Sequence, residues 1–538
     1  MTCGPPIAVN DTFPLPDHFI IIPSGNFPED NSADRNALVT QIPPSTVDSL
    51  QELKDRIEAF LLGLRRPVLI EAGREILDLS SSCYSLTYEY GKLLWHVWNE
   101  KTNFVRHLTG IGKESVSRME IRYQRFGKGP PGTLVLMESR AAPEQLQRRG
   151  ERSRFAQQLR KRLAQLCPEW RIESLTSEPD LNRSFSGSYA RGVLSRGQQV
   201  WAVIGAGPQE GTATAEGILT YGLVWLDWLR ARETKRVVQG LKILVPESAS
   251  ATTVQRLACM NSSLASWEVY ELGADVVRVD PADIGNLKTS LPHAGQKMES
   301  LSSAWIKRIR GLSREIQVRL TSDGACTLNI AGLPFAREGV NGVFFGIGRA
   351  ETLLTDSNFP ELQRLISKIV RIRRPSSQDP LHPYYRLQPE KWMQSLLVRE
   401  LRVLDPNLAP EIVYEQVPAF SGLERGLMDL LAVNSQGRLV IVECKAAEDI
   451  HLPLQALDYW MRVRWHQQRG DLEANGYFPN KKLNAEKPLL LLVSPALQFH
   501  PACETVLKYF SPEIEVVRIG LNESWREKVQ VVFRLGRN

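Results

Sequence analysis

Residues 426–449, GLMDLLAVNSQGRLVIVECKAAED, place charged side chains inside two apolar runs that have the composition of β-strands. Asp429 interrupts the first run, and Glu443 and Lys445 interrupt the second. Successive side chains of a strand point to opposite faces, so Glu443 and Lys445 share one face. Asp429 joins that face only if the connecting loop has an odd number of residues, because a shift of one residue reverses every side chain.

The residues between the two runs predict such an odd loop. A loop of Ser435, Gln436 and Gly437 would combine a type I turn with a final residue in the left-handed region, which glycine adopts readily. This loop would set Asp429 opposite Glu443. A two-residue loop would send Asp429 to the other face of the hairpin and remove the site.

Two carboxylates in this position require compensation. At about 4 Å they repel by roughly 4 kcal/mol at an effective dielectric near 20, so one stays protonated unless a cation lies between them. Hard oxygen ligands with open positions suit Mg²⁺ or Mn²⁺. Lys445 could then orient or help to deprotonate an attacking water and offset charge on a phosphate. The alternative is a surface ion pair of Asp429 and Lys445, but the apolar strands predict burial, and buried charges are costly.

These residues resemble the PD-(D/E)xK nucleases of restriction-endonuclease-like fold. The family signature is an Asp on one core strand and (D/E)-x-K on the next, here Asp429 and Glu443-Cys444-Lys445 with thirteen residues between Asp429 and Glu443. Met428 stands where the nominal motif has Pro. The resemblance implies an α/β fold with an αβββαβ core, Mg²⁺ or Mn²⁺ held by Asp429, Glu443 and the carbonyl of Cys444, and hydrolysis of DNA. The Cys444 thiol is expected to pack in the core.

A second element follows on a predicted helix. Gln455 and Tyr459, four residues apart in QALDYW, are similar to the Q-x-x-x-Y element of the RecB-like branch, in which both residues support the site. Arg462 and His466 continue that helix face and could contact DNA phosphates.

The resemblance also implies a carboxylate on the first core helix. Glu390 and Glu400 are the candidates, and we favour Glu390. Residues 390–495 are similar to the C-terminal half of the mismatch-specific endonucleases of archaea and actinobacteria. A catalytically silent nucleic-acid-binding or scaffold protein, and an RNA or nucleotide phosphohydrolase, remain as alternatives.

An internal echo predicts a second copy of this core. Residues 191–207 align without gaps with residues 429–445, and LDWLRAR later echoes LDYWMRVR. Every catalytic position is lost, because the alignment sets Asp429 against Arg191, Glu443 against Gly205 and Lys445 against Gly207. We therefore expect an inactive nuclease-like copy, and different strand orders in the two segments would exclude it.

The length of 538 residues predicts several domains. The expected divisions are an extended or mobile segment 1–45, a helix with a strand-rich domain 46–148, the α/β copy 149–275, an α+β region 276–373, a linker 374–389 and the nuclease domain 390–538. Either Ser45 or Thr46 is the expected N-cap of the first helix.

The overall composition is compatible with a cytoplasmic DNA-binding protein. The net charge of +6 permits a polyanionic partner. Seven scattered Cys residues contain no C-x-x-C pair, so neither a disulfide framework nor a zinc ribbon is expected. The N-terminus lacks a signal pattern and no run reaches the ~20 apolar residues of a membrane span, so no membrane partner is expected. The sequence leaves open whether the protein forms a homodimer.

Overall fold

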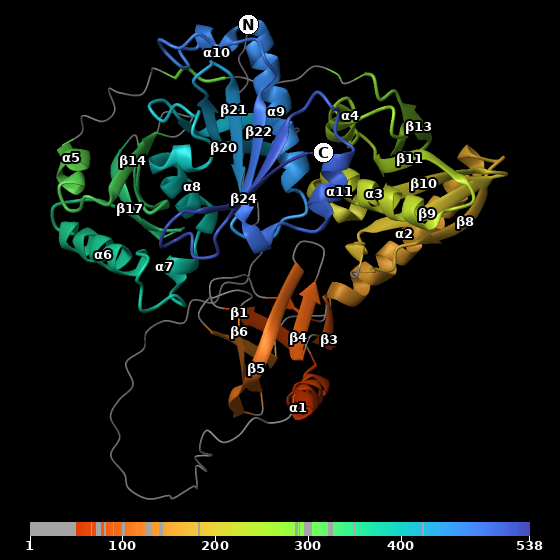
Figure 1. Cartoon of the computed structure of the whole chain (residues 1–538), viewed down its shortest axis with the longest axis horizontal. Coiled ribbons are helices and arrows are strands. Elements are labelled where there is room, and N and C mark those ends of the chain that lie inside the picture. Colours follow the sequence, from red (N-terminus) through yellow and green to blue (C-terminus); the bar gives the residue numbers. More distant parts are fainter. Residues whose placement is uncertain are drawn as a thin grey trace, which may run out of the picture. The chain divides into compact units, whose positions relative to one another are not determined.

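The computed structural model describes residues 50–537, within the unit Asp48–Asn538, except for positions 66, 72–76, 80–81, 90, 99–102, 116, 125–130, 139–143, 181–182, 284, 286–288, 290, 295–303, 321–325, 340, 349 and 422–423. The segment 1–45 and the expected N-cap at Ser45 or Thr46 lie outside these residues. The described chain contains both helices and sheets, which confirms the predicted mixed α/β class (Figure 1).

The strand-rich region begins with helix α1 (Leu50–Gly63), which buries Leu53, Ile57 and Leu61 on one face. Seven antiparallel strands form its sheet in the order β2-β1-β7-β6-β5-β4-β3. The strands are β1 (Pro67–Glu71), β2 (Leu77–Asp78), β3 (Cys83–Glu89), β4 (Lys92–Trp98), β5 (Asn103–Ser115), β6 (Arg118–Gln124) and β7 (Gly132–Glu138). The helix packs its apolar face on this sheet.

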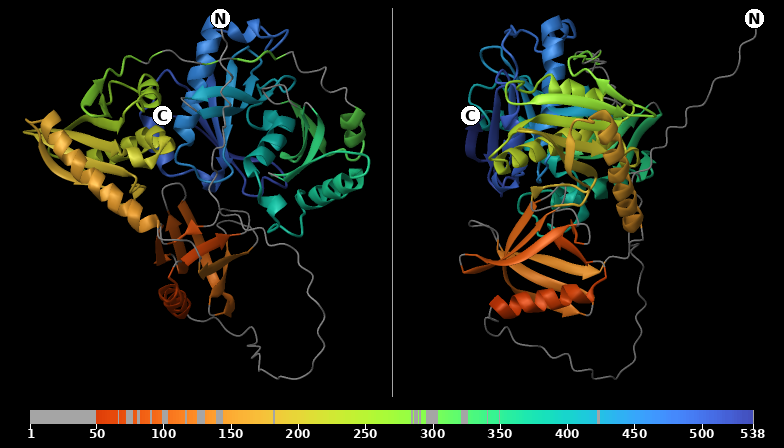
Figure 2. Two further views of the ribbon diagram at one scale, coloured as in Figure 1. Left: turned by 180° about the vertical axis from the view of Figure 1, so that it is seen from behind. Right: turned by 90° about the vertical axis from the view of Figure 1, so that its right-hand side faces the viewer.

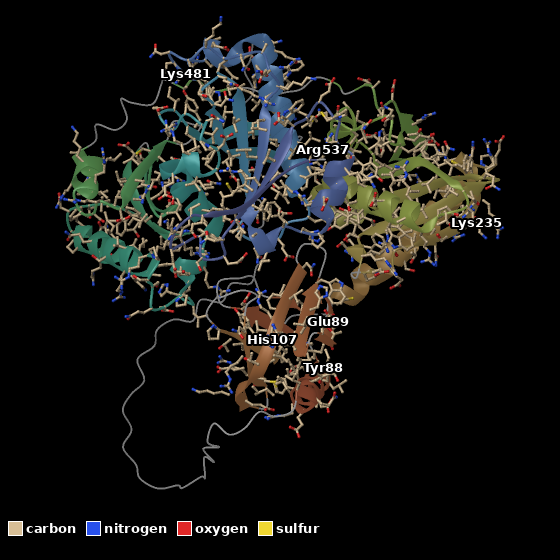
Figure 3. All side chains as sticks on the ribbon, in the orientation of Figure 1. Tyr88, Glu89, His107, Lys235, Lys481 and Arg537 are labelled. Carbon is tan, nitrogen blue, oxygen red and sulfur yellow. The ribbon has the colours of Figure 1, made fainter. Side chains whose placement is uncertain are left out.

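Residues 144–279, here called the N-lobe, form a six-stranded sheet with three main helices. Its elements are α2 (Glu144–Leu166), β8 (Arg171–Thr176), β9 (Tyr189–Arg196), β10 (Gln199–Ala206), α3 (Thr212–Arg232), β11 (Val237–Pro246), α4 (Ala251–Leu257), β12 (Ser266–Leu272) and β13 (Val276–Val279). Lys235, labelled in Figure 3, lies in the exposed turn between α3 and β11.

Residues 389–537, here called the C-lobe, form a second six-stranded sheet. Its elements are α8 (Pro389–Arg399), β19 (Tyr414–Ser421), β20 (Glu424–Val433), β21 (Leu439–Cys444), α9 (Leu452–Arg469), α10 (Asp471–Ala474), β22 (Leu489–Pro495), α11 (Ala502–Lys508), β23 (Val516–Leu521) and β24 (Val531–Gly536). Figure 2 shows this lobe from two further directions. The predicted order αβββαβ is present here.

The two lobes have the same topology. Both sheets follow sequence order, β8 to β13 in one and β19 to β24 in the other. In each sheet the first three strands pair antiparallel, the third to fifth pair parallel, and the sixth pairs antiparallel. Each lobe places its long helix between the third and fourth strands and a short helix between the fourth and fifth. The strand orders therefore meet the condition set for an internal copy.

The gapless alignment of the two hairpins is wrong by one residue. Arg196 pairs with Gln199 in the N-lobe, which leaves a loop of only two residues. Arg191 consequently lies opposite Ile204 rather than Gly205. The hairpin loop has two residues in the N-lobe and three in the C-lobe, so a correct alignment needs a gap of one residue at the turn. The similarity of the two sequences does not reveal this gap.

The described part of residues 280–373, which follow the N-lobe, contains a five-stranded meander and two helices. They are α5 (Ala304–Arg310), β14 (Ile316–Leu320), β15 (Cys326–Ile330), β16 (Leu333–Gly339), β17 (Gly342–Ile347), β18 (Ala350–Leu353) and α6 (Phe359–Ile372). The composition of 374–389 predicts a linker, but this segment contains α7 (Pro383–Arg386) and is held by Arg373. The Arg373 guanidinium donates to the carbonyls of Tyr384 at 2.7 Å and Leu387 at 2.6 Å.

Candidate active site

The β20–β21 hairpin has the predicted three-residue loop. Its strands pair from Val433 with Leu439 to Leu430 with Val442. The N–H of Asn434 donates to the carbonyl of Arg438 at 2.9 Å, which leaves Ser435, Gln436 and Gly437 as the loop. Gly437 adopts the left-handed conformation, with φ of +85°. The odd loop is therefore confirmed, and continuing the register sets position 429 opposite position 443.

Gly437 also has no room for a side chain. A Cβ atom there would lie 2.2 Å from the carbonyl oxygen of Lys482, in the connection that Lys481 marks in Figure 3. We expect Gly437→Ala to lower the free energy of unfolding by about 2 to 4 kcal/mol, because backbone strain and a steric clash add. Gly470→Ala is the matched control, since its φ is +70° with open space around it, and it should cost about 1 kcal/mol. Urea unfolding measures both, and equal losses would contradict the role of the clash.

The Asp429 carboxylate lies where the two strands separate. The backbone ladder ends at the pair Leu430–Val442. Beyond it, Asp429 Oδ2 accepts a hydrogen bond from the Cys444 N–H at 2.8 Å. Its Oδ1 accepts from the amides of Gln394 and Gln416. The carboxylate thus replaces the next main-chain hydrogen bond and keeps the strand ends apart.

Glu443 and Lys445 occupy the same region from β21. Glu443 is 1% exposed, and its Oε2 atom has no hydrogen-bond partner among the described residues. Its Oε1 lies 3.7 Å from the Nζ of Lys445, which is also 3.5 Å from Oδ2 of Asp449. Buried carboxylate oxygens are rarely left without a partner, so Oε2 marks a position for a further cationic or hydrogen-bonding group.

The electrostatics of the cluster follow from its burial. Burial raises the pKa of Asp429 to about 6, and the charge of Glu390 adds to this. The pKa of Glu443 is raised well above its ordinary value, by burial first and by the Asp429 charge second. The pKa of Lys445 is lowered by burial but raised more by the surrounding carboxylates, with a net increase. Lys445 therefore stays charged beside these carboxylates.

Helix α9 supplies the predicted pair beside the carboxylates. Gln455 Nε2 donates to Tyr459 Oη at 3.0 Å. Tyr459 is buried, and its pKa is raised by burial and then by the charge of Glu443. The structure thus brings Gln455, Tyr459 and Glu443 together.

The two candidate glutamates, Glu390 and Glu400, lie at opposite ends of helix α8. Glu390 is half-buried in its first turn and accepts from the Ala446 N–H at 3.4 Å. Glu400 caps the far end of the helix and is exposed. Only Glu390 is close enough to raise the pKa of Asp429, which agrees with the preference for Glu390.

Arg462 and His466 are not available to DNA in this arrangement, which corrects the prediction for them. They are 4% and 6% exposed. Arg462 donates to Gln255 of α4 at 3.3 Å, and the His466 ring lies within hydrogen-bond distance of Thr289 and Asp471. Both residues lie on helix α9 as predicted, but the N-lobe and the segment that follows it cover them.

Three further residues complete the site and were not predicted. Gln394 is buried on α8 one turn after Glu390, and this spacing of four residues was the signal in the sequence. Gln416 reaches Asp429 from β19, where its φ of +51° interrupts the pairing. Asp449 follows Lys445 by four residues and forms an ion pair with it. Nothing in the sequence pattern marks Gln416.

The oxygen donors fit the predicted Mg²⁺ or Mn²⁺. Among the described residues, no group of three or more His, Cys, Asp and Glu side chains could hold a metal ion. The site instead offers two buried carboxylates, one with an unpartnered oxygen, and Mg²⁺ commonly takes one or two carboxylates and completes its shell with water and phosphate. The Cys444 thiol packs in the core, as expected, and burial raises its pKa.

Comparison with known proteins does not identify the chain. No protein-family model matches it, and no curated protein does either. Within the described part of the chain, no helix combines the length and the apolar character needed to cross a membrane.

Proposed function

We propose that the C-lobe is a metal-dependent nuclease that hydrolyses phosphodiester bonds in DNA. The observation that carries this proposal is the buried pair Asp429 and Glu443, with an unpartnered carboxylate oxygen beside a charged Lys445. Burial of two repelling carboxylates costs stability, so the arrangement is better explained by binding of a cation than by a role in folding.

Each residue has a role in this proposal. Asp429, Glu443 and the carbonyl of Cys444 would hold Mg²⁺ or Mn²⁺. When bound, the ion would lower the pKa of a water ligand and neutralise charge on the phosphate. The Lys445 ammonium would orient the attacking water and stabilise negative charge that develops on the phosphate.

The remaining residues position the reacting groups. Gln394 and Gln416 hold Asp429 by hydrogen bonds, while Glu390 adds negative charge that favours cation binding. Gln455 and Tyr459 support the site from the Glu443 side.

The proposal is tested with the purified full-length chain on single-stranded DNA, duplex DNA, RNA and nucleotides, with Mg²⁺, Mn²⁺ or EDTA. We expect DNA cleavage that EDTA abolishes and that Asp429→Ala and Lys445→Ala remove, while Glu400→Gln retains it. Wild-type activity no greater than that of the Asp429 and Lys445 variants would favour a silent binding protein. Preferential turnover of RNA or nucleotides would identify the other alternative.

Tyr459→Phe tests the supporting pair. We expect roughly a tenfold lower kcat, because Gln455 loses the hydroxyl that holds it, and a stability loss of about 1 kcal/mol for one neutral hydrogen bond. Tyr270→Phe removes a buried hydroxyl contact to Glu268 in the N-lobe and is the matched control. Steady-state kinetics and thermal unfolding measure the two effects. An equal loss of activity in both variants would contradict the supporting role of Gln455 and Tyr459.

A further inference from the structure

The N-lobe and the C-lobe share one hydrophobic core. Buried residues of α3 and α4 and of α9 and α11 belong to a single contiguous cluster. Helix α3 contacts α11, and helix α9 contacts α4, so the long helix of each lobe meets the short helix of the other. This reciprocity is the pattern of a twofold interface between two copies.

Equivalent residues of the two lobes meet each other at this interface. Met260 and Phe510 each close the same turn after the short helix, donating to Leu257 at 3.0 Å and Leu507 at 3.1 Å respectively. These two residues form an isolated antiparallel bridge. Its hydrogen bonds run from Asn261 N to Tyr509 O and from Ser511 N to Cys259 O, both at 2.8 Å. A residue that contacts its own equivalent lies on the local twofold axis.

Each lobe also provides one aspartate that forms an ion pair with a basic residue on the short helix of the other lobe. The echo LDWLRAR and LDYWMRVR makes Asp227 and Asp458 equivalent. Asp227 pairs with Lys508 of the C-lobe at 2.6 Å, and Asp458 pairs with Arg256 of the N-lobe at 2.7 Å.

A second self-equivalent contact lies seven residues before each of these aspartates, at Thr220 inside α3 and at His451, the residue that precedes α9. Thr220 Oγ1 lies 3.0 Å from Nδ1 of His451. The Met260–Phe510 bridge and the Thr220–His451 contact therefore join equivalent residues, while the two ion pairs share equivalent aspartates and bind basic residues at different positions of the short helices.

The position in the N-lobe that corresponds to the candidate site cannot hold a metal ion. Arg191 takes the place of Asp429, and its guanidinium donates to the carbonyls of Ser186 at 2.6 Å and Glu178 at 2.5 Å. With or without the gap at the turn, Glu443 and Lys445 correspond to Ile204 or Gly205 and to Ala206 or Gly207. One pseudo-dimer thus contains one set of carboxylates.

We propose that the N-lobe takes the place of a second nuclease subunit, so that the chain works as a single-site pseudo-dimer and breaks one strand of duplex DNA at each encounter. The strand-breaking half of this inference rests on the proposed function. The surface through which two C-lobes could pair is already occupied within the chain. At the single site, the oxygen of one water bonds to phosphorus as one P–O ester bond breaks, and a proton from this water passes to the departing oxygen, which leaves one phosphate end and one hydroxyl end.

Two measurements test the proposal: the molar mass of the active protein and the time course of cleavage of a supercoiled plasmid. We expect light scattering of the active protein to give about 60.7 kDa, the mass of one chain. We expect nearly all plasmid to pass through the open circle before linear DNA appears, with Asp429→Asn producing neither. Linear DNA formed from the first time points at the rate of the open circle would overturn the inference.

A second experiment, which does not depend on nuclease activity, tests whether the N-lobe is the internal partner of the C-lobe. Asp458→Asn removes the charge that pairs with Arg256, and Asp379→Asn, at an exposed position, is the control. We expect hydrogen exchange to lose protection in both lobes of the first variant and in neither lobe of the second. Loss confined to the C-lobe would overturn the inference. Failure to cleave any nucleic acid would count against the proposed function, while the exchange result would still decide the partner role.

Discussion

Glu443→Gln is expected to lower the rate of DNA cleavage by at least about 100-fold while the chain stays folded. The substitution keeps the shape of a side chain that is 1% exposed and removes the negative charge next to Lys445. One proposed metal ligand is lost, and Lys445 is left without its strand partner. Single-turnover kinetics at saturating Mn²⁺ measures the effect on the chemical step, and thermal unfolding verifies the fold.

Glu268→Gln in the N-lobe is the matched control for Glu443→Gln. Glu268 also forms an ion pair with a lysine of a neighbouring position in a sheet, Lys242. Breaking that pair should cost stability, because it leaves a buried ammonium without its counterion, but cleavage of DNA should continue. If Glu443→Gln retained cleavage within about twofold of the wild type, the carboxylate would have no catalytic role.

The local part of the site could be predicted because it depends on short-range geometry. Strand alternation and one glycine in the left-handed region decide which face Asp429, Glu443 and Lys445 share, and all the required residues lie within one hairpin. The spacing of Gln455 and Tyr459 likewise follows from the helix period. These short-range patterns do not depend on how the rest of the chain folds.

The long-range part could not be predicted, since it depends on which surfaces meet. The face of α9 that carries Arg462 and His466 suits a nucleic acid as well as it suits another protein surface, and the sequence does not distinguish these. Gln416 reaches Asp429 only because its positive φ interrupts the pairing of β19. The sequence does not reveal the two-residue turn of the N-lobe hairpin, because an alignment without a gap still places strand residues against strand residues.

The same buried carboxylates should make the metal-free protein less stable as the pH rises. The pKa of Asp429 is about 6 in the folded chain against an ordinary value of 3.8. Between these values the unfolded chain has released a proton that the folded chain still holds, so the free energy of unfolding falls with pH from about 4 to about 6. The gap corresponds to at most about 3 kcal/mol, and the raised pKa of Glu443 extends the loss to higher pH.

Mg²⁺ should reverse this loss above pH 6, because a cation between the carboxylates favours their ionised forms. Asp429→Asn should remove both the part of the pH dependence that belongs to this carboxyl group and most of the stabilisation by Mg²⁺. Urea unfolding from pH 4 to pH 8, with Mg²⁺ or with EDTA, measures these quantities. Asp379→Asn, at an exposed position, should follow the wild type throughout. An Asp429→Asn variant with the pH profile and the Mg²⁺ response of the wild type would show that the two carboxylates do not act as one site, because a shared ion couples their charges.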